Sequence, residues 1–396
     1  MSGVMEEAER FWALGLNSIP DKQVCNRHIN EYAIRNFIRR NAEDGTCDYC
    51  GKETKVVELE ELVIFLMETV CSFYTDPADF MSYNGREGGY LGTLYDSNEI
   101  LQEHFQLDIT EQELFNDVFS SIDLSREWGN EFDYRDSPAD TLKFSWDYFK
   151  DVVQHRSRYY FGMAKDLNSI DYKLMPEEIL KEIGKNIKKY HLIKTMPVNT
   201  PLFRCRQHKG NDISVKYAGG MTSPPQAFAT QPNRMSPAGI SMFYGAFEEE
   251  TAIIETVQFE KRESRFYTTA IFNTKRALNI IDLSALPKVP SPFDVTRRNH
   301  YYALIFLTNF VKDLAKPLLD KNMVHIDYIP TQIITEYFRF PFSDRLPKAQ
   351  RIDGIIYPSS RNGKKACVLF FDNEESLEAL SFDPSSIKKV KNIMKF

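Results

Sequence analysis

The sequence predicts two domains, a mostly helical N-terminal one and a mixed α+β C-terminal one. The chain has 396 residues, which exceeds the size at which one hydrophobic core usually stops growing. Apolar residues recur at helical spacing in the first half, whereas short segments rich in β-branched and aromatic residues fill the second. Pro197 and Pro201 interrupt the chain where the two patterns meet. We therefore divide it into residues 1–192 and 193–396.

The helices of the first half are predicted from their apolar spacing. Val56 to Tyr74 reads as a core-facing helix that Asp76 and Pro77 end, and Asn84 to Gly92 reads as a loop. A helix beginning at Pro176 has acidic residues in its first turn and lysines in its last, as the helix dipole favours. Two further helices are expected over Ser97–Leu107 and Thr110–Ile122.

The second half alternates short strands with two longer helical patterns. The helical patterns cover His300 to Ala315 and His325 to Phe338. The expected strands are Ser241–Phe247, Arg265–Asn273, Ala277–Ile281, Ile352–Tyr357 and Ala366–Phe371.

Composition excludes several classes of function. The net charge of -7 argues against a general nucleic-acid-binding surface, which needs a basic excess. No apolar run approaches the length of a membrane span, and the acidic start is unlike a secretory signal, so we expect a cytoplasmic, reducing environment. The basic residues near the C-terminus are expected to form a solvated helix face; they are Lys388, Lys389, Lys391 and Lys395.

Two short knuckles between residues 25 and 50 have the spacing of a zinc site. Cys25 and His28 form a C-x-x-H pair, and Cys47 and Cys50 form a C-x-x-C pair followed by Gly51. Three thiolates and one imidazole suit tetrahedral zinc and leave no open position for a substrate. We therefore predict a structural zinc that holds an N-terminal region with little core of its own.

Polar residues at strand and helix ends are the candidates for chemistry. They are Arg204, Arg234, Tyr244, Glu255 and Ser359. Each residue type also has a purely structural interpretation. The arginines could form surface ion pairs, the tyrosine could lie in the core, and the glutamate could lie on a half-exposed helix face. Ser359 and its neighbour Ser360 also suit a turn after Pro358, so the choice between the two serines is open.

In this order, these residues resemble the RES domain over roughly residues 195–375. The strongest pieces are NRMSPAGISMFYGAFEEETAIIE and DGIIYPSSRNGKKACVLFF. The N-terminal half, with its two knuckles and helices, is similar to the HEPN/RES N-terminal domain. The resemblance implies a C-terminal fold like that of ADP-ribosyltransferases and a toxin-like enzyme that consumes NAD.

The resemblance also implies roles for the candidates. Arg234, Glu255 and Ser359 would be the family's arginine, glutamate and serine, and Arg204 and Tyr244 would complete the pocket. Arginine forks bind pyrophosphate oxygens, and a carboxylate stabilises the positive charge that develops on the ribose. NAD is then the substrate, and no helper cofactor is required because nicotinamide is a good leaving group.

Three functions follow from this likeness. The leading one is cleavage of NAD at the nicotinamide–ribose bond by hydrolysis or phosphorolysis; the alternatives are ADP-ribosyl transfer to a macromolecule and a non-catalytic nucleotide sensor. An antitoxin or inhibitory partner is expected from the family, and a homo-oligomer is left open. No histidine has the arginine spacing of the HEPN ribonuclease motif, so the N-terminal domain is interpreted as regulatory.

Overall fold

The computed structural model describes residues 2–86, 88–130, 138–161, 174–257, 265–316 and 323–391. Its contacts divide the chain into two compact units, residues 1–138 with 288–303 and residues 139–287 with 304–396. Each unit is mixed α+β: the first combines helices with small sheets, and the second combines helices with one large sheet. The domain division at residue 193 stays a prediction.

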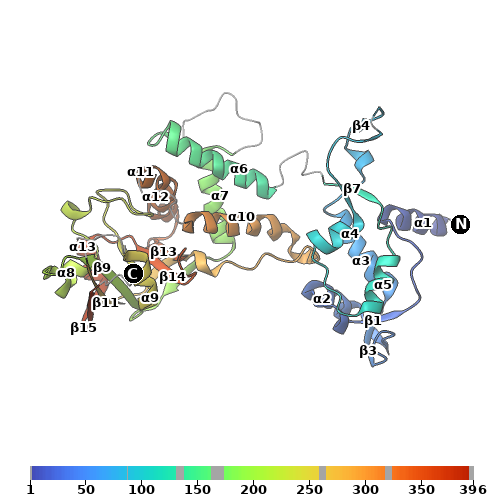
Figure 1. Ribbon diagram of the computed structural model, residues 1–396, viewed down its shortest axis with the longest axis horizontal. Coiled ribbons are helices and arrows are strands. Elements are labelled where there is room, and N and C mark those ends of the chain that lie inside the picture. Colours follow the sequence, from blue (N-terminus) through green and yellow to red (C-terminus); the bar gives the residue numbers. More distant parts are fainter. Residues whose placement is uncertain are drawn as a thin grey trace. The chain divides into compact units, whose positions relative to one another are not determined.

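The first unit combines helices with small antiparallel sheets (Figure 1). Its helices are α1 (Ser2–Leu14), α2 (Tyr32–Asn41), α3 (Leu59–Cys71), α4 (Ser97–Glu99) and α5 (Gln112–Ser120). Strands β1 (Gln23–Cys25), β3 (Glu53–Glu58) and β2 (Glu43–Thr46) form one sheet in that order. Two strand pairs are β4 (Tyr83–Asn84) with β5 (Gly89–Tyr90), and β6 (Leu94–Asp96) with β7 (Glu127–Gly129).

Helix α3 forms the centre of the first unit's core. The predicted apolar face is confirmed, because Leu62, Val63, Leu66, Met67 and Val70 are all buried. The helix begins later than predicted, since the two valines before it belong to β3. The segment 288–303 adds Phe293 to the same core.

The second unit is built on an eight-stranded sheet in the order β15-β11-β9-β10-β14-β13-β12-β8. Neighbouring strands are antiparallel except β12 and β13, which are parallel. The strands are β8 (Ile193–Met196), β9 (Pro201–His208), β10 (Phe243–Ala246), β11 (Phe266–Thr274), β12 (Leu278–Asp282), β13 (Gly354–Pro358), β14 (Lys365–Leu369) and β15 (Leu380–Lys391).

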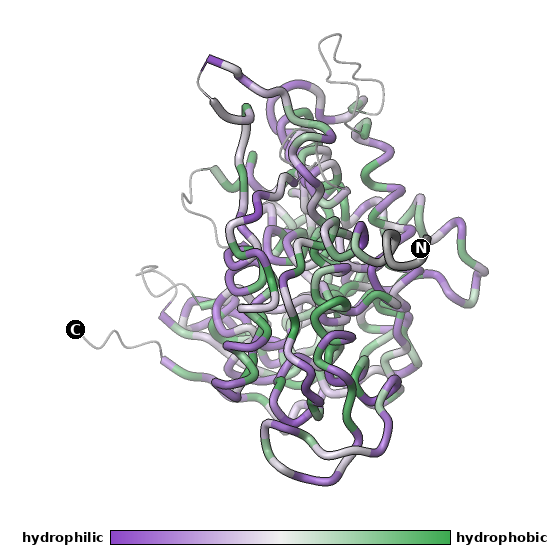
Figure 2. The backbone as a smooth tube through the Cα atoms, turned by 90° about the vertical axis from the view of Figure 1, so that its right-hand side faces the viewer, coloured by the Kyte–Doolittle hydropathy of each residue, from purple (hydrophilic) through white to green (hydrophobic). Residues whose placement is uncertain are grey.

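The remaining helices include those predicted from Pro176, over 300–315 and over 325–338. They are α6 (Pro138–Asp151), α7 (Pro176–Lys189), α8 (Ala218–Met221), α9 (Glu249–Thr256), α10 (Arg298–Ala315), α11 (Val324–Asp327), α12 (Ile329–Tyr337) and α13 (Asn373–Ala379). Residues 298–303 of α10 belong to the first unit, and the other residues of that helix belong to the second. Helix α7 begins at the predicted proline, and Tyr328 divides the pattern expected over 325–338 into α11 and α12. Hydrophobic and hydrophilic stretches alternate along the tube in Figure 2, as expected when each element buries one face.

The predicted basic helix face near the C-terminus is wrong. Lys388, Lys389 and Lys391 lie on β15, which pairs with β11 at the end of the sheet order, and Lys395 lies outside the described residues. A charged strand at a sheet edge discourages pairing with other chains, and its exposed lysines resemble a solvated helix face in sequence.

Candidate functional site

The hairpin between β13 and β14 positions Ser359. The Ser359 N–H donates to the Lys364 carbonyl at 2.8 Å, and the Ser359 carbonyl accepts from the Gly363 N–H at 2.8 Å. Gly363 has a φ of 71°, a left-handed conformation that glycine adopts without steric cost. Asn362 ties the hairpin to α9 by donating to the Thr251 hydroxyl at 3.0 Å. This turn chemistry holds Ser359 buried, with only 2% of its surface exposed.

The Ser359 hydroxyl donates a hydrogen bond to Oε1 of Glu255, in the last turn of α9. The same hydroxyl accepts from the Arg361 N–H at 3.2 Å. Glu255 is exposed although its acceptor oxygen contacts a buried hydroxyl. The structure therefore brings two predicted site residues together and leaves part of the carboxylate open to solvent. The Ser360 hydroxyl makes no hydrogen bond with any residue that the structure describes.

Arg204 and Tyr244 form a second pair of predicted residues, on β9 and β10. Arg204 lies inside its strand rather than at its end, and it donates to the carbonyls of Tyr244 at 2.8 Å and Met221 at 3.3 Å. Its guanidinium lies 5.8 Å from the centre of the Phe243 ring. Desolvation lowers the pKa of Arg204. Arg204 therefore holds two backbone carbonyls in place and forms no ion pair with an acid in the described chain.

Tyr244 exchanges a hydrogen bond of 2.9 Å with the Ser236 hydroxyl. Burial raises the pKa of Tyr244 to about 12, so its phenol stays neutral at physiological pH. The tyrosine is thus held at both ends, through its carbonyl by Arg204 and through its hydroxyl by Ser236.

Arg234 is anchored by helix ends. Its Nη1 donates to the Leu314 carbonyl at 2.8 Å and to the Lys316 carbonyl at 2.6 Å, where α10 ends. Its guanidinium lies 5.5 Å from the centre of the Tyr328 ring. Gln332 on α12 fixes the preceding residue by donating to the Asn233 carbonyl at 2.9 Å. Arg234 is therefore a rigid cation whose contacts are neutral carbonyls.

Two tyrosines that we did not predict share this environment. Burial raises the pKa of Tyr328; Glu255 raises it further, and the charges of Arg234 and Arg361 oppose the shift. Burial holds the pKa of Tyr357 well above its usual value, with Glu255 and Tyr244 adding to the rise and Arg234 opposing it. Arg234 lies 5.5 Å from the centre of the Tyr328 ring, which puts that tyrosine beside a predicted site residue. Both tyrosines lie in stretches of apolar residues, so the sequence alone predicts them to be part of the hydrophobic core.

Arg361 was also missed as a site residue, although it stands two residues after Ser359. Its side chain is exposed and makes no hydrogen bond or ion pair within the described part of the chain. Its charge nevertheless acts on Tyr328. Arg361 is therefore a cation at the site with its donors available to a ligand.

The predicted metal ligands converge in the first unit. All four ligand atoms of Cys25, His28, Cys47 and Cys50 lie within 4.8 Å of one another. The C-x-x-C knuckle turns at Gly51, whose φ is 63° and whose N–H donates to the Cys47 carbonyl at 2.8 Å.

The spacing of these atoms fits zinc. The sulfurs of Cys25 and Cys50 are 3.9 Å apart, and the Cys47 sulfur lies 3.5 Å from His28 Nε2. Tetrahedral zinc separates two sulfurs by about 3.8 Å and a sulfur from a nitrogen by about 3.6 Å. The cluster is compatible with a structural zinc, since the donor set is closed and three of its residues are buried.

Comparison with known families identifies both parts of the chain. Residues 40–166 match the HEPN/RES N-terminal domain 1, and residues 201–385 match the RES domain. All five predicted site residues fall inside the second match, and RES domains are generally toxin domains linked to NAD-related activity. A search of curated proteins gives no significant match. Among the described residues, no helix has the length and apolarity to cross a membrane. The chain therefore carries a HEPN/RES N-terminal domain 1 followed by a RES domain.

Proposed function

We propose that this protein cleaves NAD at the nicotinamide–ribose bond, on a C-terminal fold of the ADP-ribosyltransferase type. The observation that carries the proposal is the hydrogen bond from buried Ser359 to the exposed carboxylate of Glu255. It fixes a negative charge where a substrate can reach it. Arg234 and Arg361, whose charges act on the same tyrosine as that of Glu255, Tyr328, pair with no acid in the described chain.

The chemistry requires a carboxylate beside a developing cation. As the bond from ribose C1′ to the nicotinamide nitrogen breaks, its electron pair leaves with nicotinamide and positive charge develops on the ribose. Glu255 stabilises that charge, and it can accept a proton from the water that attacks C1′. Ser359 holds the carboxylate in one orientation, which avoids reorganisation during the reaction.

The cations are suited to the pyrophosphate. Arg361 has free donors and can bind phosphate oxygens directly through its planar fork. Arg204 and Arg234 spend part of their donors on carbonyls but keep their charge, so both still attract an anion. Tyr244 provides a neutral aromatic wall for the nicotinamide ring.

The zinc has a separate, structural role in this proposal. Cys25, His28, Cys47 and Cys50 would hold it, and it would join the two knuckles beside the small buried cluster that contains Val56.

ADP-ribosyl transfer is the second candidate because Glu255 is exposed and could meet a macromolecular acceptor. Transfer and hydrolysis share the bond cleavage and differ in the nucleophile that attacks C1′. The toxin context also leads us to propose an inhibitory partner protein for the cell that makes this enzyme.

The experiment measures NAD loss and nicotinamide release by purified protein freed of bound partners. Wild type and Glu250→Gln should cleave NAD, since Glu250 lies on the same helix and has no partner among described residues. Glu255→Gln should lose roughly 10²–10³-fold in rate, the typical effect of removing an electrostatic catalyst. Radiolabelled NAD then separates free ADP-ribose from labelled macromolecule. A wild type that releases no nicotinamide refutes the proposal and leaves nucleotide sensing, whereas a fully active Glu255→Gln variant refutes the catalytic role of Glu255.

A further inference from the structure

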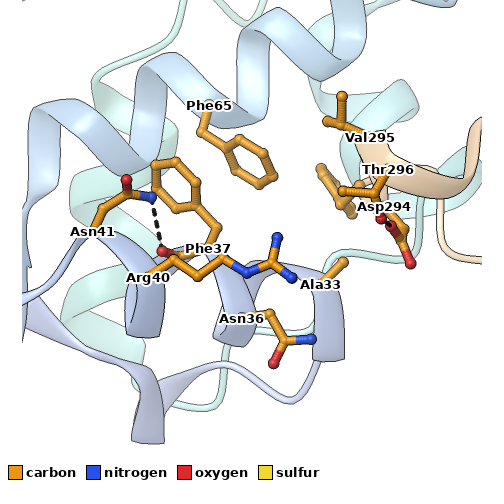
Figure 3. A pocket seen from close by; sticks show the side chains of 10 residues that line it. Ala33, Asn36, Phe37, Arg40, Asn41, Phe65, Asp294, Val295 and Thr296 are labelled. Atoms are coloured by element: carbon orange, nitrogen blue, oxygen red, sulfur yellow. Dashed lines mark hydrogen bonds between the residues drawn. The ribbon is translucent and has the colours of Figure 1, made fainter.

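A pocket of about 270 Å³ lies in the first unit, and none of the residues of the proposed NAD site lines it (Figure 3). Helix α2 forms one wall, α3 contributes Phe65, and the segment 293–296 forms the opposite wall. The volume falls just below the range of about 300–1,000 Å³ typical of drug-sized ligands. A dinucleotide is therefore too large for this pocket, whereas a single ring with one substituent is suitable.

The floor of the pocket is flat and aromatic. Phe37 and Phe65 are stacked, with ring centres 4.1 Å apart and planes at 10° to each other. Phe293, which is buried, lies 6.4 Å from Phe65 and continues the apolar surface. Stacked rings present flat faces and edges that planar ligands contact more fully than branched ones do.

The α2 wall of the pocket carries a positively charged side chain that has no partner among the described residues. Asn36 and Arg40 lie one turn apart on α2, and Figure 3 shows the Arg40 guanidinium extending across the pocket toward the 294–296 wall. Neither side chain makes a hydrogen bond or ion pair with any residue that the structure describes. The amide of Asn41, in contrast, already donates to the Phe37 carbonyl at 2.9 Å.

The one acidic group that lines the pocket is already compensated. Asp294 accepts from the Tyr32 hydroxyl at 2.9 Å, from the Thr296 hydroxyl at 2.6 Å and from Arg297 at 3.0 Å. These donors hold the pKa of Asp294 below its usual value against the opposing effect of burial. The charge left available to a ligand is therefore the positive charge of Arg40.

We propose that this pocket binds a small planar aromatic carboxylate. Its ring would pack on an outer face or the edges of the stacked Phe37–Phe65 pair, and its carboxylate would accept from the Arg40 fork and the Asn36 amide. A ligand there would contact α2 and α3 together with the 293–296 segment, which are far apart in sequence. The site would give the first unit a ligand of its own, independent of NAD cleavage.

The test is calorimetric titration of the full chain with benzoate, beside nicotinamide and inorganic phosphate as probes. Saturable binding of benzoate is expected, with nicotinamide weaker because it lacks the charge and phosphate weaker because it lacks the ring. Arg40→Ala should weaken benzoate binding by about 10–100-fold, the effect of one charge-assisted hydrogen bond. Arg39→Ala, an exposed neighbour that does not line the pocket, should leave it unchanged.

Two results would overturn the proposal. Equal weakening by Arg39→Ala and Arg40→Ala would show general attraction to a basic helix, and phosphate binding as tight as benzoate would show a simple anion site. A Phe37→Leu variant provides a further readout, because it should reduce benzoate affinity while thermal unfolding reports whether the unit stays folded. Unchanged benzoate affinity in that variant would also contradict a site on the aromatic floor.

Discussion

Replacing Arg234 by alanine should destabilise the second unit as well as remove a cation from the site. The side chain makes two hydrogen bonds to the carbonyls where α10 ends and lies over the Tyr328 ring. A hydrogen bond from a charged donor contributes about 1.5–3 kcal/mol. The ring contact adds about 0.5–1 kcal/mol.

The total is smaller than the sum of these contacts. Lys316 is exposed, so water can replace the donor lost at its carbonyl. Counting one full bond and the ring contact gives a loss of about 2–4 kcal/mol in the free energy of unfolding. In a unit of this size that corresponds to a decrease in melting temperature of roughly 5–15 °C.

Differential scanning calorimetry measures this effect, with Arg351→Ala as the matched control. Arg351 also loses a guanidinium, but its ion pair with Asp344 is exposed, with 59% and 61% of the side chains accessible. Such a pair contributes little, so the control should melt with the wild type. If Arg234→Ala also melted with the wild type yet lost NAD cleavage, the anchoring role would be refuted and a direct substrate contact supported.

The remaining predictions concern the metal and the substrate contacts. Cys47→Ser should lose the stoichiometric zinc found by elemental analysis and unfold the first unit at lower temperature, whereas Cys71→Ser, outside the cluster, should keep both. Ser359→Ala should lower kcat because Glu255 loses the hydroxyl that positions its carboxylate, whereas Ser360→Ala should keep wild-type turnover. The reverse result would assign the positioning role to Ser360. Arg361→Ala should raise KM for NAD by about 10-fold or more at unchanged melting temperature, since its exposed side chain makes no hydrogen bond or ion pair with a described residue. An unchanged KM would exclude pyrophosphate binding.

Helices with strong patterns could be predicted from the sequence, and edge strands could not. Helix α7 combines apolar spacing with a proline start and lysines at its end, all local signals, and it forms where predicted. Strand β15 contains Pro384 and several lysines and serines, a composition that argues against a strand. Its conformation depends on pairing with β11, more than a hundred residues earlier in the chain, which no local pattern reveals.

The site shows the same division. The residue types were predictable because their chemistry suits NAD, but their contacts were not. Glu255 and Ser359 are separated by 104 positions, and only the packing of α9 beside the β13–β14 hairpin brings them into contact. Tyr328 and Tyr357 escaped prediction because a buried aromatic residue at helical or strand spacing is usually part of a core.

The carbonyl contacts of the two predicted arginines also resolve an apparent conflict between anchoring and anion binding. A carboxylate partner would cancel the charge of Arg204 or Arg234, whereas a carbonyl fixes the side chain and leaves its full positive charge. Arg234 uses only Nη1, and Arg204 uses Nε and Nη1, so each retains donors that no described residue accepts. Both cations are thus held rigid before any anion arrives, which lowers the entropy lost on binding. Arg361, which has no such anchor, must be ordered by the substrate, so its contribution should appear in KM.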